Sequence, residues 1–424
     1  MKIMKYKSAL LFLLLACCLL AAALPACTLA PLEGERASME RAAAVLENGQ
    51  NILREKLEED IASLEKTAAR GSAEAAILLL RIYSSPPLGA ILQLPPDSDS
   101  EVNALNTLKL LGEKGDLAAQ RYLADYFRAD DETEKCAGEN ARQSFYWKRL
   151  AAGQGGQQDM SQLGYLYLIG CGVERDEEQG FQWSLAAARL GQPEAQFNTA
   201  YCYYLGRGAE VSYYYAIYWF EQAGRNGSAR ARLSLADLYT SAPPPYRDYH
   251  KAFLLYKEET AQSNAADAWV GLGEAYERGR GVKRDYRQAA LCYEKASRQF
   301  HDLGYHYLGH LYLNGQGVTK DLDKAYDLFL SAVYVENWGG ARHHLGDMYY
   351  QGLGVNRDYR QAFKWYMEGA EQGYHGSCYM VGRMYELGRG VDKDMDAALE
   401  WYRKAAADEN DKDGKAALRR LKAQ

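Results

Sequence analysis

One pattern recurs in this chain at intervals of 36 or 37 residues. Its clearest copy, LGHLYLNGQGVTKDLDKA, extends from Leu308 to Ala325. The tyrosine of its LGxxY core stands in seven copies, at Tyr167, Tyr203, Tyr239, Tyr276, Tyr312, Tyr349 and Tyr385. A self-repeat of this length indicates stacked supersecondary units that bury one continuous core between neighbours. The sequence therefore predicts a repeat array, which constrains the fold more than any other feature of the chain.

Each copy is predicted to form two antiparallel helices joined by a short loop. The first helix carries a small residue ahead of the tyrosine, as at Gly309, where we expect a close backbone approach by a neighbouring helix. Paired glycines form the loop in six copies, because glycine readily supplies the positive φ that ends a helix. A strong N-cap then begins the second helix, at Asp176, Ser212, Asp248, Asp285, Asp321, Asp358 and Asp394.

The repeat length, glycine loop, capping residue and aromatic second helix together closely resemble the Sel-one-like repeat, a relative of the tetratricopeptide repeat. The resemblance implies an all-α fold, a right-handed α-solenoid of stacked antiparallel helix pairs, used for protein–protein assembly and without catalytic residues. We assign seven repeats to residues 161–407 and degenerate helical repeats with loop insertions to residues 37–160. A polar helix within residues 408–424 is expected to cap the open end.

The first 26 residues are predicted to be a signal peptide and not part of the fold. Three lysines precede an apolar run, residues 9–24, that is short for a bilayer span. Residues 24–27, LPAC, resemble the lipobox of bacterial lipoproteins, which implies lipidation of Cys27 and a tether over residues 27–36. Two alternatives remain open: a rival box that ends at Cys17, and an ordinary signal-peptidase cut after Ala26.

The charge of the exported chain argues against a nucleic-acid partner. Removal of the signal peptide takes three lysines from 50 basic residues and leaves 47 against 56 acidic residues, a net charge near −9. Nucleic-acid binding rests on basic surface, which this balance does not favour. Thr28 follows Cys27 where an aspartate often marks inner-membrane retention, so the resemblance points to a periplasmic protein anchored to the outer membrane.

Five cysteines follow Cys27. An exported protein can form disulfides, and Cys136 and Cys171 lie 35 residues apart in predicted interhelix loops, where stacking brings them near each other. Their disulfide is a hypothesis at this stage, and the odd number of cysteines argues against complete pairing. Cys292 occupies a core position and is predicted to be a buried thiol.

Four residues on two consecutive first helices form a candidate metal site. His306 and His310 lie four residues apart, and His343 and Asp347 occupy the same two repeat positions 37 residues later. Adjacent helices of a stack lie about 8–10 Å apart, so the four side chains are candidates to converge. Imidazole and carboxylate ligands suit zinc. The competing interpretation is an ordinary polar surface, and no cofactor is predicted.

The position two residues before the repeat tyrosine is the candidate partner-binding position. It varies where its neighbours repeat, and we expect it to be exposed and to tolerate substitution. It carries Asp237, Glu274, His310, Asp347 and Arg383. Because first helices of such stacks line the concave side, these side chains are expected to select a partner with basic or hydrogen-bond-donating groups.

The leading functional hypothesis is an exported, lipid-anchored scaffold of a bacterial envelope assembly, similar in layout to polysaccharide-secretion lipoproteins. A secreted regulator or effector that binds cell-surface proteins is the first alternative. An envelope hydrolase or β-lactamase-like enzyme is the second. Ser63-Leu64-Glu65-Lys66 matches the serine–lysine motif of penicillin-binding enzymes, but the S-D-N and K-T-G motifs that accompany it are absent. We therefore predict that the chain is not an enzyme.

Overall fold

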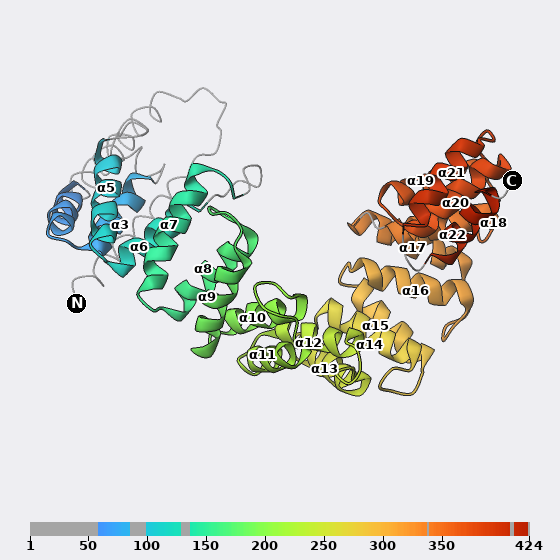
Figure 1. The fold of residues 1–424 in the computed structure, drawn as a ribbon, viewed down its shortest axis with the longest axis horizontal. Coiled ribbons are helices and arrows are strands. Elements are labelled where there is room, and N and C mark those ends of the chain that lie inside the picture. Colours follow the sequence, from blue (N-terminus) through green and yellow to red (C-terminus); the bar gives the residue numbers. More distant parts are fainter. Residues whose placement is uncertain (1–57, 85–98, 129–135, 337–338, 408–410, 423–424) are drawn as a thin grey trace, which may run out of the picture. The chain divides into compact units, whose positions relative to one another are not determined.

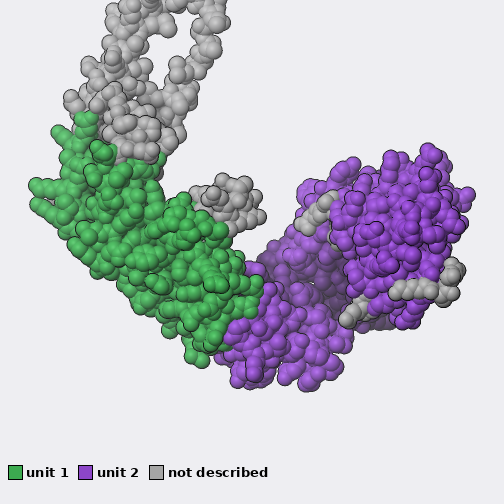
Figure 2. Space-filling model, turned by 45° about the horizontal axis from the view of Figure 1, so that its top comes forward, with its two compact units in different colours: residues 1–190 green, residues 191–424 purple. Residues whose placement is uncertain are grey.

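The computed structural model describes residues 58–84, 99–128, 136–336, 339–407 and 411–422. All regular secondary structure among these residues is helical (Figure 1). The chain divides into two compact units, residues 1–190 and 191–424 (Figure 2). The predicted signal peptide, Cys27 and the tether lie outside the described residues, as do residues 85–98 and 129–135 of the stretch predicted to carry loop insertions.

Unit 1 begins, in its described part, with a helix over residues 58–69. The helices that follow are α3 (Ala73–Tyr83), α5 (Asp99–Glu113), α6 (Leu117–Tyr126), α7 (Glu139–Gly153), α8 (Gln157–Ile169) and α9 (Glu177–Arg189). Leu80, Leu108 and Leu123 are fully buried and pack in one cluster with the ring of Trp147. An apolar core therefore joins α3, α5, α6 and α7, although the repeat pattern is weak in this part of the sequence.

Unit 2 consists of consecutive helix pairs and a last helix. The pairs are α10 (Pro193–Leu205) with α11 (Tyr213–Arg225), α12 (Ala229–Ser241) with α13 (Tyr249–Gln262), α14 (Ala266–Arg278) with α15 (Tyr286–Ser297), α16 (Asp302–Asn314) with α17 (Leu322–Glu336), α18 (Gly339–Gln351) with α19 (Tyr359–Glu371), and α20 (His375–Leu387) with α21 (Met395–Ala405). Each first helix packs on its own second helix, and each second helix packs on the next first helix. This stacking confirms the predicted all-α, α-solenoid fold class within the unit.

The repeat residues act as the sequence predicts at the loops and helix starts. All seven predicted N-caps accept a hydrogen bond from a backbone N–H in the first turn of the second helix. Gly281 has φ of +74°, and a Cβ there would lie 2.1 Å from the carbonyl oxygen of Tyr249. The loop after α14 therefore requires glycine both for its backbone conformation and for its contact with the preceding repeat.

The glycine inside the first helix is explained by an aromatic ring. A Cβ at Gly273 would lie 2.4 Å from the ring of Tyr293, which is fully buried on α15, the second helix of the same repeat. A close approach does occur at this glycine, but it is made by a side chain of the paired helix and not by its backbone, as we expected.

The chain end is helical as predicted, because α22 (Lys412–Lys422) packs on α21. Its last turns carry basic side chains, of which Arg420 pairs with Glu386 on α20 at 2.6 Å. Among the described helices, none combines the length and apolar character needed to cross a bilayer.

Candidate functional site

The predicted partner-binding residues stand in register on the first helices of unit 2, on α12, α14, α16, α18 and α20. Asp237 and Arg383 are exposed, but Glu274, His310 and Asp347 are only partly exposed. The expectation of an exposed position is therefore wrong for these three residues. These side chains are partly buried because neighbouring first helices contact each other and cover part of their surface.

Two of the carboxylates are held by buried tyrosines. The hydroxyl of Tyr256 donates to Asp237 at 2.5 Å, and that of Tyr366 donates to Asp347 at 2.6 Å. Partial burial of the carboxylate raises the pKa of Asp237. Each of these aspartates accepts a hydrogen bond from a buried hydroxyl, and alanine in its place would leave that hydroxyl without its acceptor. The expectation that the two aspartates tolerate substitution by alanine is therefore wrong.

Consecutive first helices meet through different repeat positions. Tyr307 on α16 lies beside Glu274 on α14, a separation of 33 residues. The same arrangement recurs 34 residues apart, where His344 on α18 faces His310 on α16. The side chain two residues before the repeat tyrosine thus points towards the next repeat. The residue that it meets there stands five positions before the tyrosine of that next repeat.

A cavity of about 260 Å³ opens beside Asp237 and Glu274, between α12, α13 and α14. Gly271 contributes no side chain to its wall, and Asp267 adds a third carboxylate. The ring of His301 donates a hydrogen bond to Asp267 across 3.0 Å, and this bond holds the pKa of that aspartate below its usual value. Three carboxylates around one cavity favour a ligand that brings hydrogen-bond donors or positive charge.

Sequence reasoning missed two aromatic members of the same repeat position. Tyr201 on α10 and Tyr165 on α8 each stand two residues before the repeat tyrosine, and both are exposed, at 36% and 51% of their surface. Their position in the repeat is the signal in the sequence that identifies them. We call the residues at this position in unit 2 the first-helix face: Tyr201, Asp237, Glu274, His310, Asp347 and Arg383.

The histidines gather in a different set from the one predicted. The side chains of His306, His310 and His344 form a histidine cluster, in which one ligand atom of each residue lies within 4.8 Å of the others. His343 turns away, with its Nδ1 atom 3.3 Å from the hydroxyl of Ser377. Pairing His343 with His306 by repeat position was wrong, because neighbouring helices touch through opposite faces and not through equivalent residues.

Asp347 lies at the edge of this cluster. Its Oδ2 atom is 3.7 Å from Nδ1 of His344 and 3.6 Å from Nε2 of His343. Burial acts to raise the pKa of this carboxyl, but the adjacent rings of His344 and His343 and the hydroxyl of Tyr366 hold it below its usual value. Asp347 therefore stays ionised next to the imidazoles.

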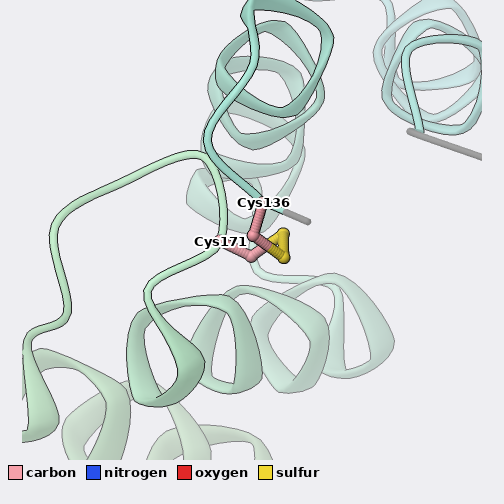
Figure 3. The surroundings of a disulfide bond; sticks show 2 residues. All are labelled: Cys136 and Cys171. Carbon is pink, nitrogen blue, oxygen red and sulfur yellow. A yellow bond between two sulfur atoms is a disulfide. The ribbon is translucent and has the colours of Figure 1, made fainter. Parts of the chain in front are cut away.

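The structure joins Cys136 and Cys171 in a disulfide (Figure 3). Cys136 precedes α7 and Cys171 follows α8, so the bond ties together the loops on either side of one helix pair. The backbone N–H of Gly172 also donates to the carbonyl of Cys136 at 2.8 Å. The cysteines of unit 2, Cys202, Cys292 and Cys378, are buried thiols, which is the state predicted for Cys292.

The serine–lysine motif and a second cavity are two other candidate sites. Ser63 and Lys66 are both exposed on the helix at residues 58–69, so no enclosed pocket surrounds the serine–lysine motif. A larger cavity of about 520 Å³ lies between α11, α12 and α13. Three basic residues line it, Arg225, Arg232 and Lys251, and Arg232 is already engaged by the buried carboxylate of Glu259 at 2.6 Å and by the carbonyl of Gly224.

Comparison with known proteins identifies the repeats. Residues 158–192, 193–228, 266–299, 303–334, 340–374 and 375–410 match the family described as Sel1 repeat. The crystal structure of a Sel1 repeat protein from Oxalobacter formigenes is similar over 75% of this chain and 90% of its own, with 26% identity and a TM-score of 0.60. A protective antigen of uropathogenic Escherichia coli strains that displays an SLR fold is similar over 86% of this chain and 90% of its own, with 22% identity and a TM-score of 0.44. No curated protein matches the sequence.

The unmatched stretch between residues 228 and 266 is the repeat in which three prolines replace the paired glycines. Helices α12 and α13 nevertheless form a pair there, and Asp248 caps α13 like its counterparts. The packing of the array is therefore continuous through this copy.

Proposed function

We propose, from the six Sel1 repeats that make this chain a member of the Sel1 repeat family, that it is an exported and membrane-anchored scaffold. Proteins of this family generally mediate protein–protein interactions, so the partner is another protein. We assign its docking to the first-helix face of unit 2. The second helices supply the packing surfaces that hold the stack together.

The observation that carries the proposal is the acidic cavity on that face. Asp237, Asp267 and Glu274 line one opening, and Arg280 in the same lining balances only part of their charge. Arg278 pairs with Glu274 at 3.2 Å and keeps 45% of its side-chain surface exposed, so an incoming basic group can replace it at small cost. A partner segment that carries lysine, arginine or exposed backbone N–H groups is the occupant that fits this chemistry.

Two features support export and anchoring. The leader has a basic start, an apolar run and a lipobox-like end at Cys27. Disulfides persist in oxidising compartments such as the periplasm, and the Cys136–Cys171 bond suits a protein that works there. A lipid on Cys27 would hold the repeats at the membrane. The proposed location is the periplasmic side of the outer membrane, within an envelope assembly.

One experiment in living cells tests anchoring and docking together. A photoreactive p-benzoylphenylalanine replaces Tyr201 on α10, and in a matched protein it replaces Tyr214 on α11 of the same repeat, where the tyrosine is 63% exposed. We expect a discrete crosslinked adduct from position 201 only, recovered in the membrane fraction. In the Cys27→Ser background, labelled fatty acid should no longer be incorporated and the adduct should move to the soluble fraction.

Each outcome has a distinct meaning. Adducts of equal yield from positions 201 and 214 would contradict docking on the first-helix face. Equal lipid labelling of the wild type and Cys27→Ser would rule out Cys27 as the anchor. An adduct that forms outside the cell with a surface protein would replace the scaffold proposal with that of a secreted regulator.

A further inference from the structure

The histidine cluster has the composition of a metal-ligand set. Nε2 of His310 lies 2.9 Å from Nε2 of His344, and the ring centroids of His306 and His344 are 5.2 Å apart. Nitrogen ligands on one tetrahedral zinc ion, each about 2.0–2.1 Å from the metal, lie roughly 3.3 Å from one another. One ligand atom of each of the three residues lies within 4.8 Å of the others, so rotation of the imidazole rings would bring them to this spacing.

The three rings come from two helices whose positions are fixed. His306 and His310 are one helical turn apart on α16, so they present their rings on one face. His344 reaches them from α18, the next first helix. The buried ring of Phe329 on α17 forms the floor, with its centroid 5.0 Å from that of His344. An apolar floor of this kind holds the rings in place and limits the access of water.

The state of the rings favours coordination. His306 is buried, with 6% of its surface exposed, and His310 and His344 are partly buried. Burial disfavours the charged imidazolium form, and the neutral imidazole is the form that binds a metal ion.

Asp347 completes the arrangement from outside the cluster. Its carboxylate faces Nδ1 of His344, so a proton on Nδ1 leaves Nε2 of the same ring free of hydrogen and directed towards His310. Metal-binding histidines commonly donate their second N–H to a carboxylate, which fixes the tautomer and makes the ligand more basic. The hydroxyl of Tyr366 holds this carboxylate from its other side.

We propose that His306, His310 and His344 bind a divalent transition-metal ion, with zinc as the best fit, and that Asp347 positions His344 as an outer partner. Three imidazoles exclude calcium and magnesium as the preferred ions, because both take oxygen ligands. His310 and His344 remain partly exposed, so a water molecule, or a carboxylate or imidazole of the docked partner, can supply the fourth ligand. The proposal stands independently of the partner-binding function.

The test is zinc titration of the tag-free chain by calorimetry. We expect one Zn²⁺ per chain, and visible d–d absorption of a tetrahedral site when Co²⁺ is used in its place. Replacement of His310 or His344 by glutamine should weaken zinc binding by at least about 100-fold, and Asp347→Asn by about 10- to 100-fold, the range for outer partners of a metal site.

The neighbouring His343→Gln is the matched control, because this ring lies on the same helix and faces Ser377. It should keep the wild-type affinity and cobalt spectrum. Thermal melting without metal identifies any variant that fails to fold, and the His310→Gln and His344→Gln substitutions are independent tests on separate helices. Absence of zinc binding by the wild type, or equal affinity of wild type, His310→Gln and His344→Gln, would overturn the proposal.

Discussion

At the scale of single residues, the most informative feature is a tyrosine on a second helix that hydrogen-bonds a carboxylate on its first helix. It recurs as Tyr256 with Asp237, Tyr293 with Glu277, Tyr366 with Asp347, and Tyr402 with Glu386. The sequence separation alternates between 19 and 16 residues, because the acceptor is either of two residues one turn apart. A fixed-spacing search along the sequence therefore does not detect these pairs.

The pair of Tyr366 and Asp347 gives a test of this interaction. Tyr366→Phe should lower the free energy of unfolding by about 1.5–3 kcal/mol, the range for hydrogen bonds to charged groups. Tyr214→Phe, which removes the hydroxyl of an exposed tyrosine, should change it by less than about 0.5 kcal/mol. Urea denaturation followed by circular dichroism measures both. Equal midpoints for the two variants would show that the buried hydroxyl contributes nothing to stability.

At the scale of helices, local signals in the sequence predicted the elements but not their contacts. Glycine loops and capping residues act within a few residues, so the starts of the second helices are found where Asp285 and its equivalents predict them. The contact between consecutive first helices depends on their relative rotation, which no local signal encodes. That rotation places His344 against His310, whereas His343, which is equivalent to His306 by repeat position, faces Ser377. The cysteine pair was foreseeable because both members lie in loops, whose order in a stack follows from the repeat.

Helices α16 and α18 also make the stability of the protein sensitive to acid. Burial lowers the pKa of His306 to about 2 and those of His310 and His343 to about 4. Unfolded histidines titrate near about 6.5, so between about pH 6.5 and 4 the unfolded chain binds more protons and stability falls as pH falls. Each histidine contributes at most about 1.4 kcal/mol per pH unit to this slope.

Melting temperatures between about pH 7.5 and 5 measure the effect, without added metal. Above about pH 5, the carboxylates whose pKa is lowered, such as Asp267 and Asp347, remain ionised in both states and add little. The melting temperature should therefore fall with pH in the wild type, and less steeply in the double variant His306→Gln, His310→Gln. A slope that is the same in both proteins would show that other groups control the acid sensitivity.

At the scale of the whole chain, the repeated position two residues before the tyrosine changes chemistry along the sequence. It is aromatic at Tyr165 and Tyr201, acidic at Asp237 and Glu274, and basic at Arg383. Two residues at this position, Asp237 and Asp347, also accept hydrogen bonds from buried tyrosines, but each side chain keeps some exposed surface. The order of side chains along this position therefore forms a pattern that a partner can match. The repeats predict the architecture and the register of this pattern, whereas the identity of the partner depends on a second molecule and is not encoded in them.

The most direct measurement of the central claim is the affinity of the crosslinked partner for a variant of the first-helix face. Asp237→Asn, Glu274→Gln and Asp347→Asn together remove three charges while each amide oxygen keeps an acceptor for its neighbour. The matched control removes three exposed carboxylates from second helices, by Glu178→Gln, Glu371→Gln and Glu400→Gln. We predict weaker binding by the first variant only, with a larger loss at low salt, where charges are least screened. Unchanged affinity of the first variant, or an equal loss in the control, would contradict docking on this face.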